Sequence, residues 1–338
     1  MPFLNAFLRA TGAFTFRSPL LRALVPCAAA ALAVQAAAAA PSILARSERF
    51  YDLSGSVTVL AVGALSLYLP ALRARAAAAG LPSLLDAFRP GAAGAARWNW
   101  RQVVATGLAM MWTIRLGSYL FKRILSSGGK DSRFDNIRDR PAAFAAAFGA
   151  QAAWVTLMLA PVIALNAVVP GGATLASAAA SASSSSRALV TDVLGLAVWA
   201  LGFGFEAVAD AQKSRWVREK RDKVHDEAFM TRGLFSKSRF PHYFGEITLW
   251  TGLATFCAGA LATAPAQAAL GLRSVGGGAA GVLATSAACF VAPAFSAFLL
   301  TRVSGIPMSE GKYDERYGHR ADYRAWKRDV PRLVPKLW

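Results

Sequence analysis

The chain has 338 residues, of which 55% are hydrophobic and 17% charged, and its mean hydropathy is +0.38. Several nearly uninterrupted apolar runs have the length needed to cross a hydrocarbon core about 30 Å thick. This excludes an ordinary soluble globular protein and predicts an all-α fold, a polytopic transmembrane bundle of about six or seven helices. The formal net charge is +18, but the basic residues lie in short loops between apolar runs, where they set membrane topology. We therefore expect no nucleic-acid partner.

In chain order, the apolar runs predict seven spans. They cover residues 20–40, 54–72, 102–121, 142–168, 188–209, 244–264 and 279–301. The first span is the least typical. No acidic residue precedes Glu48, and residues 1–40 consist of alanine and leucine patches flanked by arginine or serine. Such a composition also fits an organelle transit peptide. We divide the chain into an N-terminal segment at 1–45, which spans or targets, and a membrane domain at 46–338.

The charges of the loops predict which of them share a side of the membrane. Residues 170–187 and 265–278 hold one charge each and are expected to be non-cytoplasmic, while 122–140, 210–242 and the tail from Arg302 are rich in Lys and Arg and are expected to be cytoplasmic. The pattern weakens upstream, where five arginines fall in a loop that should lie on the other side.

The three cysteines predict no metal site. Cys27, Cys257 and Cys289 lie in or beside apolar runs and show neither a CxxC pair nor metal-ligand spacing. They are typical of small packing residues.

The third span contains a polar face. Trp112, Arg115, Tyr119 and Lys122 follow helical spacing, so they share one side of the helix. A charge in hydrocarbon costs a few kcal/mol or more unless it faces the bundle interior, which makes Arg115 a candidate site residue. Alternatively, Arg115 extends to the membrane surface beside Lys122 and Arg123.

The end of the fifth span carries a second polar face. Glu206, Asp210 and Lys213 are spaced to share one side of a helix, and Asp210 and Lys213 are the candidate pair. An exposed helix extension laced with ion pairs would also explain these two residues. It would not explain Glu206, which still lies within the apolar run.

The segment SRFPHYFGE precedes the sixth span and suits a flat, phosphorylated ligand. Arg239 offers a planar fork of donors for phosphate, while Phe240 and Tyr243 offer faces for a heterocycle. Gly245 permits close backbone approach, and Glu246 can accept a hydrogen bond from a ribose hydroxyl or an amide. A nicotinamide dinucleotide has these features.

Two further points concern this segment. Pro241 predicts the end of a preceding helix and a loop, with Gly233 and Ser238 marking the turn before it. A structural alternative places Arg239 at lipid headgroups and the aromatic side chains in an interfacial belt.

Taken together, the motifs resemble the steroid 5-alpha-reductase-like superfamily of membrane proteins and, more narrowly, its DUF1295 branch. The matching pieces are W-x-x-R-L from Trp112, G-K-D-S-R from Gly129, E-A-V-A-D-A-Q-K from Glu206, S-R-F-P-H-Y-F-G-E-I from Ser238, a tail with Tyr313 and Tyr317, and a terminal V-P-R-L-V-P. The combination is specific although no single piece is, and it covers most of the chain.

The resemblance implies a reductase that binds NADPH at the cytoplasmic ends of the C-terminal helices and reduces a carbon–carbon double bond conjugated to a carbonyl in a lipid-like substrate. The implied cofactor residues are Asp210, Lys213, Arg239, His242, Tyr243 and Glu246, with Arg115 and Arg133 as phosphate partners and Tyr313 or Tyr317 closing over the cofactor. The chain departs from the family pattern at Phe240 and His242, where histidine and asparagine are usual. The departure at His242 is expected to affect which cofactor the protein selects, because an imidazole lacks the paired donor and acceptor of the asparagine amide.

Such a reaction needs a proton donor aimed at the carbonyl oxygen, where negative charge accumulates as hydride moves to the beta carbon. Tyr119, which shares the face of Arg115, and Asp52, which opens the second span, are the candidate catalytic residues. Helix capping is the more ordinary role for Asp52.

Two other function classes remain open. Isoprenylcysteine and phospholipid methyltransferases have a related membrane fold and a similar R-x-P-x-Y-x-G element but use S-adenosylmethionine. Glu246 directly after Gly245, together with the extra arginines, favours a dinucleotide, since the methyl donor carries no phosphate. A non-catalytic lipid-binding or transport protein would distribute its polar residues along a pathway. The expected partners are a lipid-like substrate and membrane lipids; the expected location is the endoplasmic reticulum, with an organelle membrane as the alternative.

Overall fold

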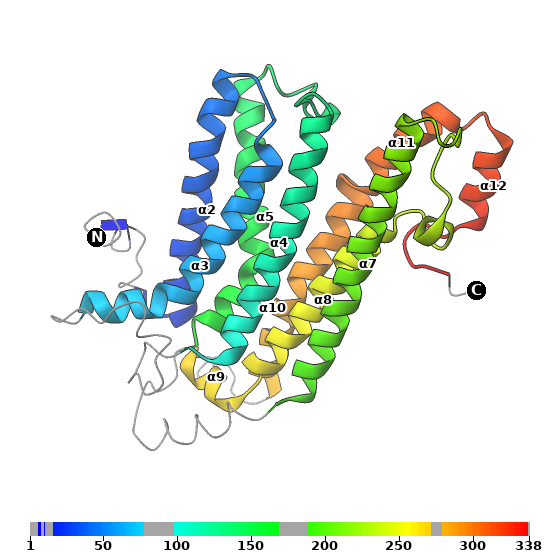
Figure 1. Ribbon diagram of the computed structural model, residues 1–338. Helices are drawn as coiled ribbons and strands as arrows, with labels where there is room; N and C mark the ends of the chain where they lie inside the picture. Colours follow the sequence, from blue (N-terminus) through cyan, green and yellow to red (C-terminus); the bar gives the residue numbers. More distant parts are fainter. Residues whose placement is uncertain are drawn as a thin grey trace. The chain divides into compact units, whose positions relative to one another are not determined.

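A computed structural model of the chain describes residues 6–7, 10, 16–77, 98–168, 188–271 and 279–336. Every regular element in these residues is helical (Figure 1). Seven helices are long and apolar enough to cross a membrane: α2 (Pro19–Leu44), α3 (Tyr51–Ala77), α4 (Trp100–Ser126), α5 (Pro141–Asn166), α7 (Val190–Arg221), α8 (Pro241–Leu261) and α10 (Ala279–Phe298). The prediction of an all-α, multi-pass membrane bundle is therefore confirmed.

The shorter elements are η3 (Ser132–Phe134), η4 (Gly233–Ser236), α9 (Ala264–Ala269), the π-helical η6 (Leu299–Val303), α11 (Ile306–Tyr317) and α12 (Ala321–Asp329). Each predicted span falls largely on one long helix. The clearest differences are at α7, which continues well past the predicted end, and at Pro241. This proline is the first residue of α8 and not part of a loop, because the first helical position needs no backbone N–H and suits the φ angle of proline. The predicted serine-rich linker at 170–187 lies wholly outside the described residues.

The chain forms two compact units, with boundaries inside α8 and α10. One takes in the described residues of Met1–Leu189 and Cys257–Cys289, and the other consists of Val190–Phe256 and Phe290–Trp338. Each unit is described by itself.

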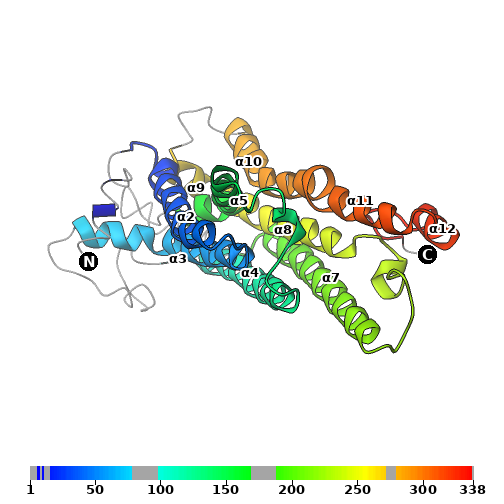
Figure 2. The ribbon, with the colours of Figure 1, turned by 90° about the horizontal axis from the view of Figure 1, so that it is seen from above.

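In the first unit, α2, α3, α4 and α5 pack side by side as a bundle, which Figures 1 and 2 show from two directions. Buried polar side chains join the helices. Gln35 Nε2 donates to Thr58 Oγ1 at 2.7 Å, and Asn166 Nδ2 donates to Ser66 Oγ at 2.8 Å and Thr106 Oγ1 at 3.0 Å. Such bonds between apolar helices fix which residues face one another.

In the second unit, α7 and α8 pack with their backbones in contact. The contact is made by four glycines, Gly195 and Gly202 on α7 and Gly245 and Gly252 on α8. A Cβ atom at Gly195 would lie 2.7 Å from the amide nitrogen of Phe256, and one at Gly245 would lie 2.6 Å from that of Glu206. The glycines on each helix are two turns apart and so share one face. Only glycine permits so close an approach.

The C-terminal tail lies along the segment that leads into α8. The Arg239 amide donates to the Pro331 carbonyl and the Lys336 amide donates to the Lys237 carbonyl, each at 2.9 Å. Ser238 Oγ donates to the Leu333 carbonyl at 2.7 Å. The two segments therefore share one end of this unit. That this end is cytoplasmic stays a prediction.

Candidate functional site

The residues predicted for the site fall in both units. The first unit contains Asp52, Arg115, Tyr119 and Arg133, and the second contains Asp210, Lys213, Arg239, His242, Tyr243, Glu246 and Tyr317. Across the described part of the chain, no group of three or more His, Cys, Asp or Glu side chains is placed to hold a metal ion.

Arg239 is largely buried, with 11% of its side chain exposed, and its guanidinium pairs with the carboxylate of Glu310 on α11. Glu310 also contacts Arg332 of the tail, whose Nε lies 3.3 Å from Oε2. The Nε atom of Arg239 is buried and has no hydrogen-bond partner among the described residues. Two guanidinium groups thus share one carboxylate, which leaves donors and a positive charge for an anion.

The start of α8 brings the neighbouring candidates together. Because α8 begins at Pro241, His242, Tyr243 and Glu246 lie in its first two turns. Ser238 Oγ accepts a hydrogen bond from the Phe240 amide at 3.2 Å while donating to the tail. The segment therefore turns sharply into the helix and is held by the tail.

Aromatic rings pack on one another at this position. Phe240 and Tyr243 stack with centroids 5.8 Å apart and planes at 17°, and His242 lies 4.1 Å from Tyr243 by the same measure. Phe240 is buried, so its ring stabilises the turn and is closed to a ligand. Tyr243, half-buried and packed beside Gly305, is the better placed ring of the two for stacking.

On α7, Glu206 and Asp210 are buried, with 2% and 7% exposure, and Lys213 is half-buried. This argues against a solvated ion-pair helix at Asp210. Gln212 Oε1 accepts a hydrogen bond from the Leu234 amide at 2.9 Å, next to Gly233, whose φ is +60°. The residues after α7 therefore fold back onto this face of the helix.

Glu246 faces α10, where Ser296 Oγ approaches its Oε1 at 3.4 Å. Tyr317 lies instead in an aromatic group at the end of α11, where its ring stacks 5.8 Å from that of Tyr313 and lies tilted 5.6 Å from that of Phe229. Through Phe229, Tyr317 contacts the segment between α7 and α8. Such a position suits a residue that covers this end of the unit.

In the first unit, Asp52 and Arg133 are partners of each other. Arg133 Nη2 lies 2.9 Å from Asp52 Oδ2 and 2.8 Å from Asp131 Oδ2, and Arg123 lies 3.6 Å from Asp52. Asp52 is the second residue of α3, in its first turn and past the N-cap. A carboxylate held by two arginines is a hydrogen-bond acceptor, which is the opposite of the role of proton donor. Tyr119 is therefore the better candidate donor.

Arg115 and Tyr119 lie on the face of α4 that turns inward. Trp112, one turn earlier, is 1% exposed, whereas Met111 and Ile114 are 51% and 55% exposed. The Nε and Nη2 atoms of Arg115 are buried. This arrangement favours an interior position for Arg115 over an extension to the membrane surface.

Sequence reasoning missed the network around Glu48, which joins the α2–α3 loop to the α4–α5 loop. Arg138 Nε donates to Glu48 Oε2 and the Asp131 amide donates to Oε1, both at 2.6 Å. Burial alone would raise the pKa of the Glu48 carboxyl, but these hydrogen bonds lower it below its ordinary value. Its position as the first acidic residue of the chain was the only signal in the sequence.

A lowered pKa makes the stability of this unit depend on pH. The folded-state value lies below the unfolded value of about 4.3, so the contribution is complete above that pH and is lost as the pH falls through the folded value. We expect the melting temperature of the detergent-solubilised protein to fall as the pH is lowered below about 4.3, and to fall less in Glu48→Gln, which is already less stable at pH 7. Parallel pH curves for the two proteins would contradict this.

The sequence model of one family, described as a protein of unknown function (DUF1295), matches residues 83–275 and 278–330. No curated protein and no solved structure matches the chain significantly. The family match covers well over half of the chain and includes every piece named for the resemblance except the terminal V-P-R-L-V-P, of which it reaches only Val330. It confirms the resemblance. The chain belongs to the DUF1295 family.

Proposed function

We propose that the protein is a membrane-bound NADPH-dependent reductase of a carbon–carbon double bond conjugated to a carbonyl in a steroid or other lipid-like substrate. The observation that carries the proposal is the meeting of Arg239 and Arg332 on Glu310, at the end of the second unit where Tyr243 also lies. Membership in the DUF1295 family and seven membrane-length helices support a multi-pass membrane enzyme.

The residues present fit a phosphorylated dinucleotide. Arg239 and Arg332 would hold a phosphate group in place of the Glu310 carboxylate, and Tyr243 would stack on a flat ring. Glu246 would accept from a ribose hydroxyl or an amide, and His242 would take the position of the usual asparagine. When bound, NADPH would supply the hydride.

The remaining candidates would act on the substrate or order the site. Tyr119 would give a proton to the carbonyl oxygen, and Arg115 on the same face would stabilise the negative charge that develops there. The ion pair of Asp52 with Arg133 would order the loop between α4 and α5. Buried Asp210 and half-buried Lys213 would shape the cofactor site on α7. We place the enzyme in the endoplasmic reticulum, with an organelle membrane as the alternative.

Binding titrations with purified protein in detergent test this proposal. We expect NADPH to bind, NADH to bind more weakly because it lacks the 2′-phosphate, and S-adenosylmethionine to show no saturable binding. Calorimetry or tryptophan fluorescence would measure the affinities. Tight binding of S-adenosylmethionine would favour the methyltransferase class, and the absence of binding by all three ligands would favour a non-catalytic lipid-binding protein.

A further inference from the structure

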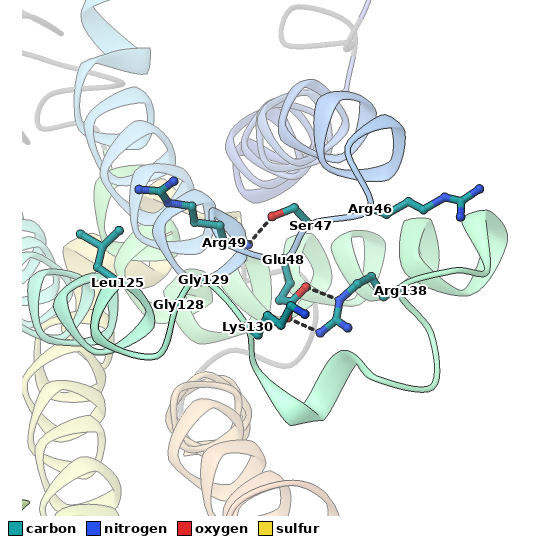
Figure 3. A pocket seen from close by; sticks show the side chains of 9 residues that line it. All are labelled: Arg46, Ser47, Glu48, Arg49, Leu125, Gly128, Gly129, Lys130 and Arg138. Atoms are coloured by element: carbon teal, nitrogen blue, oxygen red, sulfur yellow. Dashed lines mark hydrogen bonds and ion pairs between the residues drawn. The ribbon is translucent and has the colours of Figure 1, made fainter.

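A polar cavity in the first unit is not used by the proposed reductase site. It has a volume of about 440 Å³ and lies between the loop that joins α2 to α3 and the loop that follows α4 (Figure 3). Four basic side chains line it, those of Arg46, Arg49, Lys130 and Arg138, together with one carboxylate, that of Glu48. The lining therefore carries a formal excess of three positive charges.

The carboxylate does not neutralise the cavity, because its oxygens are already engaged. Glu48, with a side chain 1% exposed, is bound by Arg138 and by the Asp131 amide. Among the described residues, the one ion pair of Arg46 is an exposed contact of 3.7 Å with Asp139, a kind of pair that contributes little. No ion pair within the described ranges involves Arg49 or Lys130, and both are exposed. These two cations are available to an anion.

The walls of the cavity are fixed by the fold. The bonds of Glu48 join the two loops, and Gly128 and Gly129 adopt φ angles of +68° and +81°. A Cβ atom at Gly129 would lie 3.8 Å from Cδ of Arg49, so the glycine turn lies directly against the stem of that arginine. In Figure 3, Lys130 lies beside Glu48 and Arg138, while Arg46 and Arg49 extend to opposite sides. The fixed part thus holds Lys130 and Arg138, and the long side chains of Arg46 and Arg49, which have only weak contacts with Asp139 and Phe50 among the described residues, can close over a ligand.

We propose that this cavity binds a phosphate group, carried by the headgroup of an anionic phospholipid. Both loops connect helices of membrane length, which places the cavity where lipid headgroups lie. Apolar side chains border it: Leu125, a lining residue, is 42% exposed, and Phe50, next to Arg49, is 50% exposed and stacks on Phe121. Acyl chains would contact these side chains while the phosphate accepts hydrogen bonds from Arg49 and Lys130. Free phosphate has the same headgroup chemistry but would make no use of the apolar border.

The test compares lipid binding by the full chain in detergent micelles, with native mass spectrometry or a labelled lipid as the readout. The probes are phosphatidylglycerol, phosphatidylcholine, and inorganic phosphate as a competitor. The variant Arg49→Gln/Lys130→Gln removes the two available cations. The control Arg140→Gln/Arg324→Gln removes two charges from exposed arginines outside the cavity. Thermal melting verifies that both variants fold.

We expect the unaltered protein to prefer phosphatidylglycerol, and the variant to bind it about tenfold or more weakly, the loss typical of hydrogen bonds to a charged group. The control should keep the preference. Competition by millimolar inorganic phosphate would show that the phosphate group alone can occupy the cavity. Binding of phosphatidylglycerol without such competition would show that the acyl chains are needed for binding. Either result supports the site. An equal loss in variant and control would assign the binding to diffuse surface charge and overturn the proposal, as would no preference in the unaltered protein.

Discussion

Replacing Gly202 with alanine should strongly destabilise the second unit. A Cβ atom there would meet the amide nitrogen of Leu249 and lie 2.7 Å from the carbonyl oxygen of Gly245. Both are backbone atoms that cannot rotate away, so α7 and α8 would have to separate along their contact. Overpacking costs 1–3 kcal/mol in typical cores, and we expect a loss of about 3 kcal/mol or more here. The measurement is the melting temperature and the folded yield in detergent, followed by size-exclusion chromatography.

The same helix offers a matched control. Gly204, two residues later on α7, has nothing within 4 Å of the position of its Cβ. Gly204→Ala should therefore be neutral, or slightly stabilising through the better helix propensity of alanine. Similar melting temperatures for the two variants would show that α7 and α8 do not approach as closely as described.

The sequence alone predicted the long helices well, because continuous apolar runs of membrane length have few alternative structures. The helical spacing carried α7 past its apolar span to Lys213, but its continuation to Arg221 was not predicted because these last turns are polar. They are stabilised by the following segment, where Glu227 accepts from Trp216 Nε1 at 2.7 Å and the Lys220 ammonium donates to two carbonyls. Such support depends on tertiary contacts that hydropathy does not contain.

The glycine contact between α7 and α8 was also not predicted in full. Gly245 was singled out as a point of close backbone approach, but to a ligand. In the structure the atoms near it belong to Glu206 and Gly202. Glycines are common in membrane helices, so the spacing of Gly195 and Gly202 becomes informative only when the matching spacing on α8 is set beside it.

The candidate site was predictable as a set of residues but not as a set of partners. The sequence does not indicate that Arg239 pairs with Glu310 or that Asp52 pairs with Arg133, because the two residues of each pair are more than seventy positions apart. Glu310 and Arg332 were missed altogether. Glu310 is one of five acidic residues in the tail from Arg302, and nothing in the sequence singles it out from the other four.

Arg239→Ala should weaken NADPH binding by roughly 1.5–3 kcal/mol, the range for hydrogen bonds to charged groups. The protein should still fold, because Glu310 keeps Arg332 as its partner. Arg239→Lys should recover part of the affinity, since the ammonium keeps the charge but loses the planar fork. Arg232→Ala is the matched control: this arginine precedes the same helix, is half exposed and pairs with Glu227.

Glu310→Gln distinguishes a cofactor role for Arg239 from a purely structural one. If phosphate replaces the Glu310 carboxylate at the two arginines, removing that negative charge should leave NADPH affinity unchanged or raise it, while Arg239→Ala lowers it. If the pair only fastens α11 to the start of α8, the two variants should lower the melting temperature together, because each breaks the same largely buried ion pair. In that case both would bind NADPH as the unaltered protein does. Opposite signs in the titration would therefore place phosphate at Arg239, and equal affinities in all three proteins would remove Arg239 from the cofactor site.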